Sequence, residues 1–479
     1  MILRVIDHPY EFDMKNLCIT FFPHEKIRLE GEEDPVVVTS RRETDGSFFV
    51  SAKVYDVYRE TTAKPEPADE EHLVLSVTLY RLLSGILGFA PPWGVLYGVR
   101  PAKLMHRLCA QMGDDAAVAH FQTAFLTQKS KAELAHEVML HENRSIARSG
   151  PKSFSLYVSI PFCPTRCAYC SFVSHSIEKT HKLMTPYVDL LLRELEETAK
   201  YAKELGLELA TVYFGGGTPT TLSAQDLGRI FSTIEQNFDL SHLMEYTVEA
   251  GRPDTVTQER LEVIQAAGVQ RISINPQSFN DKVLEAIGRR HTAQQTLDAF
   301  ALARDCGFDH INMDFIAGLP KDDLPSFQRS IQTALDLQAE SITVHTLALK
   351  TSAYMVTREQ TFDLKDRLTV SNMVDYAGQT LHGAGYYPYY MYRQSKSLGN
   401  LENVGWCKPG YDCLYNVYMM DETHTVLAVG AGAVTKLRGQ NSGMIQRIYN
   451  YKYPYEYIRD FDTLLERKKR IPGFYAEYD

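Results

Sequence analysis

From residue 154 onward, short apolar and β-branched runs alternate with longer segments whose apolar residues recur at helical spacing. This alternation predicts βα units around a parallel sheet. The expected strands are Ser155–Ile160, Thr211–Phe214, Glu245–Glu249, Arg271–Asn275, His310–Phe315 and Ser341–Leu347. The expected helices are Leu183–Leu205, Ala224–Asn237, Gln258–Ala267, Ala293–Cys306 and Leu324–Leu337. In such barrels the active site forms at the carboxyl ends of the strands.

The first 60 residues have a different pattern, which is typical of a small β-rich unit. Strands are expected at Asn16–Phe22, Pro35–Arg42 and Ser47–Tyr55, with the Asp45-Gly46 turn joining the last two. The polar, proline-containing stretch Thr61–Asp69 predicts a linker. Helices are expected at Glu71–Leu87 and Ala132–Arg148. The chain thus divides into residues 1–60, a linker and helical segment at 61–150, a core barrel at 151–350 and a substrate-covering region at 351–479.

Composition narrows the class of protein. The 479 residues carry a net charge of −10, and an acidic chain with no basic block argues against a nucleic-acid partner. No run of eighteen apolar residues is present, so we expect no membrane span. Asp7 and His8 interrupt the apolar start, which argues against a signal peptide. Most of the eight cysteines are scattered rather than spaced as a disulfide framework, which favours the reducing cytoplasm.

Three cysteines form one compact motif directly after the first barrel strand. Cys163, Cys167 and Cys170 are spaced C-x3-C-x2-C, so their thiolates can reach one metal centre from a single loop. Three ligands leave one metal position without a protein ligand, as a cluster that binds another molecule requires. A structural zinc site is the alternative, but it needs a fourth cysteine or histidine, usually in a second close pair, and none lies nearby.

With Tyr169 before the third cysteine, this motif resembles the radical S-adenosylmethionine (SAM) superfamily. The longer match, from Tyr157 through Ile160-Pro161-Phe162-Cys163, is similar to the oxygen-independent coproporphyrinogen III oxidases and their relatives. The resemblance implies an α/β fold: a partial (β/α)6 TIM-like barrel with a small α+β N-terminal domain and an α+β C-terminal extension. It also implies that Cys163, Cys167 and Cys170 hold one 4Fe-4S cluster, with SAM on the fourth iron.

Further motifs at the strand ends extend the resemblance. Gly215-Gly216-Gly217-Thr218-Pro219 follows the second strand, and consecutive glycines let the backbone approach a ligand closely. By resemblance, Gly216, Gly217 and Thr218 contact the amino group of SAM. The other expected cofactor contacts are Tyr157, Tyr169, Glu249, Gln277, Arg289, Asp314 and Ala348, with Arg289 also a catalytic candidate. Each residue alone could be an ordinary turn or solvated strand end, and it is their joint occurrence that favours a site.

Substrate contacts are less well marked. Tyrosines at 386, 387, 389, 390 and 392 precede Arg393 and could line a large planar ligand, but core packing explains them equally well. Arg289, Arg393 and Arg100 are candidates for pairing with propionate groups. For Arg100 and nearby Lys103, the alternative is a helix start at Pro101 with solvated charges.

The resemblance implies oxidation of coproporphyrinogen III to protoporphyrinogen IX in haem biosynthesis, with an electron donor such as flavodoxin or ferredoxin and one or two molecules of SAM. Two alternatives stay open. A haem-binding chaperone of the same family shares Phe172, where the commonest dehydrogenases have a further cysteine, but its His-Asn-x-x-x-Tyr-Trp segment is replaced here by residues 414–418. Another radical SAM reaction on a tetrapyrrole, such as methylation with ring opening, would need a second SAM.

Overall fold

The computed structural model describes residues 1–479 except 24, 32, 43, 99, 171–174, 349–363 and 395–396. Its centre is an 11-stranded sheet in the order β13-β14-β12-β11-β10-β9-β8-β5-β15-β16-β17. Six neighbouring strands are parallel and form the predicted partial barrel: β5 (Ser153–Ile160), β8 (Glu208–Gly216), β9 (Glu245–Gly251), β10 (Arg271–Ile274), β11 (His310–Ala317) and β12 (Ser341–Thr346). The α/β fold class is therefore confirmed.

The sheet has more strands than the six parallel ones because the C-terminal region adds strands at both edges. At one edge, β15 (Thr425–Val429) pairs parallel with β5, and β16 (Val434–Arg438) and β17 (Ile445–Tyr449) follow it antiparallel. At the other edge, β14 (Glu402–Cys407) and β13 (Tyr387–Arg393) pair antiparallel beyond β12. Residues distant in sequence thus complete the walls of the barrel.

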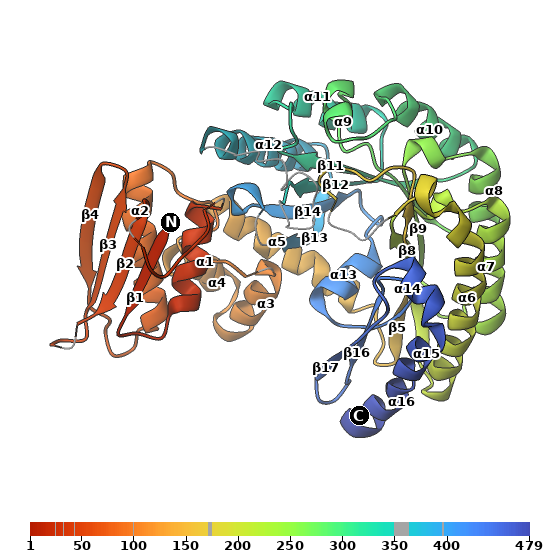
Figure 1. Ribbon diagram of the computed structural model, residues 1–479, viewed down its shortest axis with the longest axis horizontal. Helices are drawn as coiled ribbons and strands as arrows, with labels where there is room; N and C mark the ends of the chain where they lie inside the picture. The colour runs from red at the N-terminus through yellow and green to blue at the C-terminus, as the bar shows by residue number, and fades with distance from the viewer. Residues whose placement is uncertain are drawn as a thin grey trace.

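Helices cover the outside of the parallel strands in an arc (Figure 1). They are α6 (Ile177–Glu204), α7 (Ala224–Asn237), α8 (Gln258–Ala266), α9 (Asp281–Ala286), α10 (Ala293–Asp305) and α11 (Leu324–Asp336). Local signals start several of them, since Ser223, Thr257 and Thr292 each accept a backbone N–H at a helix N-terminus. All five predicted helices of this region are present, while the short α9 was not predicted.

Alternation along the parallel strands separates an apolar face from a polar one. The apolar face packs on the helices and includes Leu156, Val158, Val212, Phe214, Val248, Ile272, Ile311, Met313, Ile342 and Val344. The opposite face, which looks into the barrel, carries Glu249, Arg271, Asn312, Asp314, Thr343 and His345. The helices are held by hydrophobic burial on one side, which leaves the other side free for polar chemistry.

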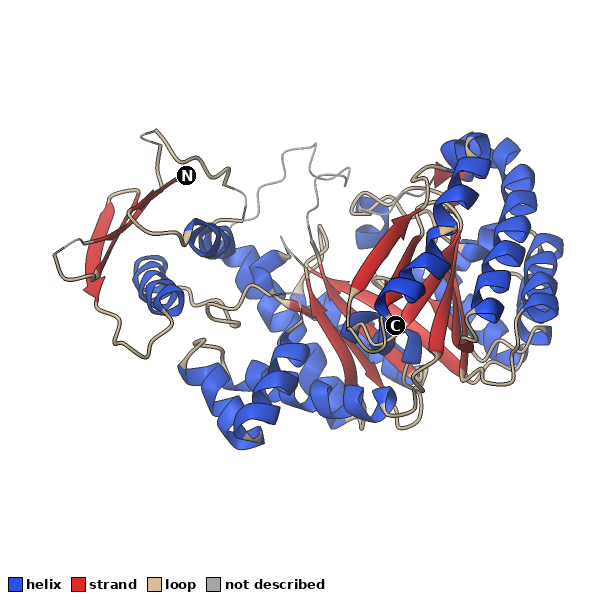
Figure 2. Ribbon diagram, turned by 90° about the horizontal axis from the view of Figure 1, so that it is seen from below, coloured by secondary structure: helices blue, strands red, loops and turns tan. Residues whose placement is uncertain are grey.

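The N-terminal unit is a four-stranded sheet backed by two helices, at the end of the molecule away from the barrel (Figure 2). Its elements are β1 (Ile2–Ile6), α1 (Glu11–Phe21), β2 (Val36–Arg41), β3 (Phe48–Val54), β4 (Val57–Ala63) and α2 (Glu71–Leu87). The predicted strand Asn16–Phe22 is wrong, because the chain there is helix α1. Met14, Leu17, Cys18 and Phe21 are buried at helical spacing, and an apolar run this short fits either period until a packing partner is known.

The predicted linker Thr61–Asp69 is wrong at its start, because Thr61–Ala63 form the end of β4. Helix α2 matches the predicted bounds, and its buried residues share one apolar core with the N-terminal strands. That core reaches Val95, well beyond residue 60. The division of the chain into domains stays a prediction.

Helices α3 (Pro101–Met112), α4 (Asp114–Thr123) and α5 (Lys129–Ile146) lie between the N-terminal sheet and the barrel. Ion pairs fasten α5: Lys131 Nζ lies 2.7 Å from the buried Glu402 Oε1 in β14 and 2.7 Å from the partly exposed Asp375 Oδ1 in α12 (Leu364–Gly383). Trp93 Nε1 donates to the other oxygen of Glu402 at 2.7 Å. Removing one partner of the buried Lys131–Glu402 pair would leave an uncompensated buried charge and destabilise the fold.

The chain ends in helices α13 (Leu414–Asp421), α14 (Pro454–Arg459), α15 (Phe461–Lys468) and α16 (Arg470–Tyr478). Helix α13 closes one side of the barrel interior, α14 and α15 pack against α6, and α16 follows α15 at the C-terminus (Figure 1). Among the helices that the structure describes, none combines the length and apolarity needed to span a membrane.

Candidate active site

A cavity of about 450 Å³ opens at the carboxyl ends of the parallel strands. Every residue that the sequence suggested for the cluster or for SAM lines this one cavity: Tyr157, Cys163, Cys167, Tyr169, Cys170, Gly216, Gly217, Thr218, Glu249, Gln277, Arg289, Asp314 and Ala348. Tyr157 and Ala348 are 191 residues apart in number, so only the barrel brings this set together. Phe172 lies outside the described residues.

The cysteine loop is held from both sides. Cys163 ends the short strand β6 (Phe162–Cys163), which pairs with β7 (His175–Ser176). Farther along the loop, the backbone N–H of Ala168 donates to the carbonyl of Ile287 at 2.9 Å. The Tyr169 hydroxyl accepts from Arg289 Nη2 at 3.3 Å. The loop therefore rests on the segment that follows α9.

Cys167 lies in a cationic environment. Burial by itself would raise the pKa of its thiol, but the guanidinium groups of Arg289 and Arg252 outweigh burial and hold the pKa below its ordinary value. Arg252 Nη1 lies 3.7 Å from Cys167 Sγ. The thiolate, the form that binds metal, is thus favoured.

Arg252 is a site residue that the sequence did not reveal. Only 3% exposed, it donates from Nε and Nη2 to the two carboxylate oxygens of Asp254, each at 3.0 Å, and from Nη1 to Thr165 at 3.1 Å. Its position just after the predicted strand Glu245–Glu249 could have indicated that Arg252 belongs to the site. Its bidentate pairing fixes the guanidinium beside the loop.

The glycine turn touches the cysteine loop through the backbone. The N–H of Gly217 donates to the carbonyl of Ile160 at 2.7 Å, and that of Thr218 to Phe162 at 2.8 Å. A Cβ on Gly217 would lie 2.5 Å from the Phe162 carbonyl oxygen and 2.8 Å from that of Ile160. Gly216 has φ +102°, which disfavours residues with a side chain. Glycine is required here by space and by conformation.

Polar side chains from adjacent strands form a network across the barrel interior. Asn312 Nδ2 donates to Asp314 at 2.8 Å, and His345 Nε2 lies 3.9 Å from the same carboxylate. Burial would raise the pKa of Asp314, but His345 and Asn312 hold it below its usual value. Asp314 is therefore an anion within the barrel.

Glu249 behaves in the opposite way. Burial raises its pKa to about 7, with the nearby negative charge of Asp314 adding to the rise, although Tyr213 donates to it at 2.7 Å. Its charge therefore changes near neutral pH.

Gln277 occupies an uncommon backbone conformation for a residue with a side chain, with φ +66°. Its N–H donates to the carbonyl of Asp314 at 2.9 Å, and its own carbonyl accepts from Ile316 at 3.2 Å. These bonds tie the chain after β10 to β11 and direct residue 277 to the cavity. Conformations of this kind persist where surrounding structure enforces them, often at functional sites.

Several buried polar atoms on the cavity wall have no hydrogen-bond partner within the described structure. They are Arg289 Nε, Asn275 Oδ1, and both Nε and Nη1 of Arg271. Buried polar groups are normally paired, so these atoms are free to bind a ligand. Arg271 was expected only as the first residue of a strand. Its alternation with Ser273 and Asn275 was the signal that it points inward.

Helix α13 supplies a wall that the sequence did not predict. Glu245 anchors it, accepting from the backbone N–H groups of Leu414 at 2.5 Å and Tyr415 at 3.3 Å. The Tyr415 ring then stacks on Tyr213, with centroids 4.4 Å apart, and on Tyr157 at 6.0 Å. Met419 and Met420 continue the wall.

The sequence left two alternatives open for the tyrosines after residue 385, lining a ligand cavity or packing in the core, and the structure shows examples of both. Tyr390 and Tyr392 line the cavity. Tyr386 and Tyr389 are core residues, whereas the Tyr387 ring stacks on His141 at 4.0 Å. Arg393 is buried and donates to the carbonyls of Leu96 and Asn400 at 2.8 and 3.0 Å. Nη1 and Nη2 are thus bonded to the backbone, whereas Nε has no partner within the described structure, and the propionate contact of Arg393 stays a prediction.

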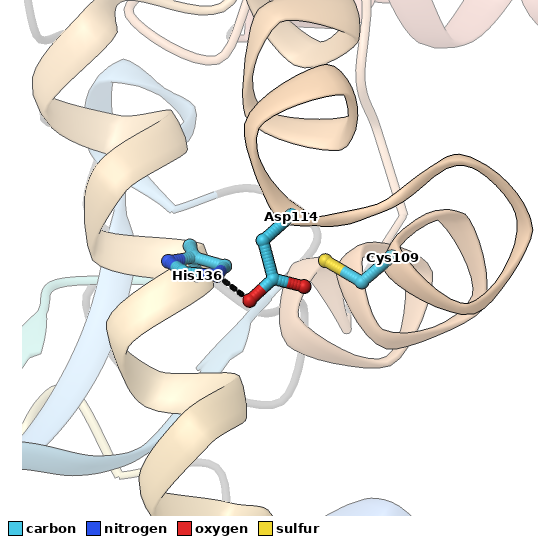
Figure 3. Close-up of side chains that lie close together, drawn as sticks. All are labelled: Cys109, Asp114 and His136. Atoms are coloured by element: carbon cyan, nitrogen blue, oxygen red, sulfur yellow. Dashed lines mark hydrogen bonds and ion pairs between the residues drawn. The ribbon is translucent and has the colours of Figure 1, made fainter.

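One other group of possible metal ligands lies away from the cavity, on α3, α4 and α5 (Figure 3). Ligand atoms of Cys109, Asp114 and His136 lie within 4.8 Å of one another, and His136 Nε2 is 3.1 Å from Asp114 Oδ2. Burial, followed by the charge of Asp114, raises the pKa of Cys109 to about 11, which keeps the thiol protonated. The hydrogen bond explains this arrangement as a contact between helices.

Comparison with known proteins agrees with this geometry. The radical SAM superfamily model matches residues 157–334. Over 470 residues, 95% of this chain and 94% of the relative, the sequence is 34% identical to the oxygen-independent coproporphyrinogen-III oxidase-like protein HemZ of Bacillus subtilis. The chain therefore belongs to the HemZ-like family within the radical SAM superfamily, whose members carry a 4Fe-4S cluster and SAM.

Two further proteins are similar to this chain, one in sequence and one in fold. The heme chaperone HemW of Haemophilus influenzae is 30% identical over 320 residues, 66% of this chain and 78% of that protein. The solved structure of coproporphyrinogen III oxidase HemN from Escherichia coli superposes with a TM-score of 0.50 at 21% identity, covering 68% of this chain and 72% of that one. This last likeness shows a shared fold.

Proposed function

We propose that this protein is a radical SAM enzyme that converts coproporphyrinogen III to protoporphyrinogen IX without oxygen, in haem biosynthesis. The observation that carries the proposal is the single cavity in which three cysteine thiols, the glycine turn and the polar strand ends meet. The substrate is inferred from the resemblance to HemZ, which extends over nearly the whole chain. We place the reaction in the cytoplasm, where thiolates stay reduced.

The cavity residues fit an iron–sulfur cluster better than one metal ion. Within the described part of the chain, the three loop cysteines do not form a group with ligand atoms 4.8 Å or less apart, whereas the Cys109 group does. A multi-iron cluster accepts wider spacing, because each cysteine binds a different iron atom. Cys163, Cys167 and Cys170 would hold the cluster, and the site leaves its fourth iron for SAM.

The protein would bind and orient SAM with the remaining residues. Gly216, Gly217 and Thr218 offer backbone and hydroxyl groups beside the cysteine loop, and Asp314 and Glu249 offer carboxylates to its cationic groups. Arg289, with a free Nε, would pair with a carboxylate. Tyr157, Tyr169, Gln277 and Ala348 complete the walls.

When bound, the cluster and SAM would supply the one-electron radical chemistry needed to remove a hydrogen atom from a propionate side chain held in the cavity. The substrate would then lose carbon dioxide and give one electron to an acceptor, which leaves a vinyl group. These steps would occur twice, once for each of two propionate side chains. A low-potential protein such as flavodoxin or ferredoxin would supply the reducing electron. The stacked rings of Tyr157, Tyr213 and Tyr415 would exclude water from the reacting atoms.

A haem chaperone is the second candidate, favoured by 30% identity to HemW over two thirds of the chain. An anaerobic assay separates the two functions. Reconstituted protein is given SAM, a low-potential reductant and coproporphyrinogen III, and products are followed by mass spectrometry. Stepwise loss of two carboxyl groups supports the oxidase. Intact SAM together with tight haem binding overturns it in favour of the chaperone, and 5′-deoxyadenosine without decarboxylation overturns the substrate.

The pKa of Glu249 predicts a pH dependence of SAM binding. Because burial raises this pKa to about 7, the carboxylate form falls from roughly nine tenths at pH 8 to one tenth at pH 6. If Glu249 binds a cationic group of SAM as an anion, the dissociation constant should rise about tenfold over that range. Anaerobic calorimetry of reconstituted protein at both pH values measures the change.

Glu249→Gln provides the control for this profile. The amide keeps the size and hydrogen-bonding capacity of the side chain but cannot ionise, so its residual slope reports the other titrating groups. We expect a flatter profile and weaker binding at pH 8. Equal slopes in the variant and the wild-type protein would refute an ionised Glu249 as the SAM contact.

A further inference from the structure

A second cavity, of about 470 Å³, adjoins the first. The two share Tyr157, Tyr392, Tyr415, Met419 and Met420 as wall residues. The shared wall is aromatic and flexible, which suits the apolar part of a large ligand. A molecule bound across the wall would reach the cysteine-lined cavity at one end and the second cavity at the other.

The second cavity has an excess of positive charge. Its cationic lining residues are Arg100, Arg393, Lys436 and Arg447, against one carboxylate, Glu422. Glu422 forms an ion pair with Arg100 through Oε2 and with Arg447 Nη2 through Oε1 at 3.1 Å. Lys103, outside the cavity lining, approaches the same carboxylate at 3.8 Å. One anion is thus shared among several cations.

Lys436 is one of the buried cations in this lining. It projects from β16 and is 7% exposed, and its ammonium donates to the carbonyl of Met419 at 3.1 Å. An ammonium has three N–H donors, so this bond leaves donors for a ligand. Burial, reinforced by Arg100, Arg447 and Lys103, lowers its pKa to about 8 despite Glu422. A bound anion would offset both the burial of this charge and its repulsion by the neighbouring cations.

We propose that the second cavity binds carboxylate side chains of a tetrapyrrole, with Lys436 and Arg447 as the cations that pair with them. The inference rests on the proposed function, because it names where the substrate's carboxylates outside the reaction centre would lie. Met419, Met420 and Tyr415 would contact pyrrole rings across the shared wall. Two ligands have the required chemistry: coproporphyrinogen, with four carboxylates, and haem, with two.

Binding of coproporphyrin III, the stable oxidised form, tests the site without turnover. Titration of cluster-reconstituted protein is followed by porphyrin absorbance, with Lys436→Met, Arg447→Gln and the double variant. Each lost cation should weaken binding about tenfold, and binding should weaken further with added salt. Arg459→Gln removes one positive charge from α14, where Arg459 pairs with its neighbour Asp460 outside the cavity, and should bind as the wild-type protein does.

Arg447→Gln keeps the test valid if Lys436→Met fails to fold, because Arg447 is 44% exposed. Unchanged affinity in Arg447→Gln overturns the proposal, even if decarboxylation is observed. Weakened porphyrin binding without decarboxylation in the wild-type protein supports this site and rejects the oxidase function. The same titration with haem identifies the source: preference for haem indicates the chaperone ligand, and preference for coproporphyrin indicates the oxidase substrate.

Discussion

Cys167→Ala is expected to abolish cluster assembly and, with it, the formation of 5′-deoxyadenosine. Cys167 is buried on the cavity wall, and Arg252 and Arg289 lower its pKa against the effect of burial. Alanine removes one of three protein ligands and leaves two buried guanidinium groups without the thiolate they face. Iron content and visible absorbance after anaerobic reconstitution measure the first effect, and mass spectrometry of SAM products measures the second.

Cys306→Ala is the matched control. This partly buried thiol follows α10, outside the lining of the cavity, and burial raises its pKa. It should therefore reconstitute and cleave SAM as the wild-type protein does. A Cys167→Ala protein with wild-type iron content and deoxyadenosine yield would contradict the assignment of the cysteine loop. Loss of the cluster in both variants would point to general instability instead.

Gly217→Ala should weaken SAM binding, and a displacement of the site by roughly 1 Å should lower the rate of SAM cleavage by about 100-fold. The added Cβ would meet the carbonyl oxygens of Phe162 and Ile160 at 2.5 and 2.8 Å. Both are backbone atoms, so no side-chain rotation relieves the contact, and the glycine turn must move away from the cysteine loop. Overpacking of this kind also costs about 1–3 kcal/mol of stability. Anaerobic calorimetry with SAM, the rate of 5′-deoxyadenosine formation and urea unfolding measure the three effects.

Gly228→Ala tests whether any glycine substitution in the barrel has this result. Gly228 lies inside α7, where a Cβ would be 3.7 Å from Val263 Cγ1, an ordinary contact. Alanine in a helix interior is favoured over glycine by about 0.5–1 kcal/mol, so this variant should gain stability and keep its SAM affinity. If Gly217→Ala bound SAM as tightly as Gly228→Ala does, close backbone approach at the turn would not be essential.

The central α/β region was predictable because its signals are local. Alternating polar and apolar positions, strand lengths and helix caps such as Ser223 and Thr292 lie within a few residues of one another. The N-terminal unit was predicted less well. The run Asn16–Phe22 fits a strand or a helix until its buried face meets the sheet, and the exposed strand β4 has no apolar face to mark it.

The sequence by itself determined the fold class, the cysteine loop, the glycine turn and the set of polar strand ends, because each is a short motif or a periodic pattern. Only the tertiary structure decided what lies between them. Arg252 reaches Cys167 across 85 positions, Glu245 anchors α13 across 169, and Lys436 meets a carbonyl on that helix from β16. It also decided that Nη1 and Nη2 of Arg393 donate to backbone carbonyls. Such pairings depend on how distant elements pack, and no local period in the chain encodes them.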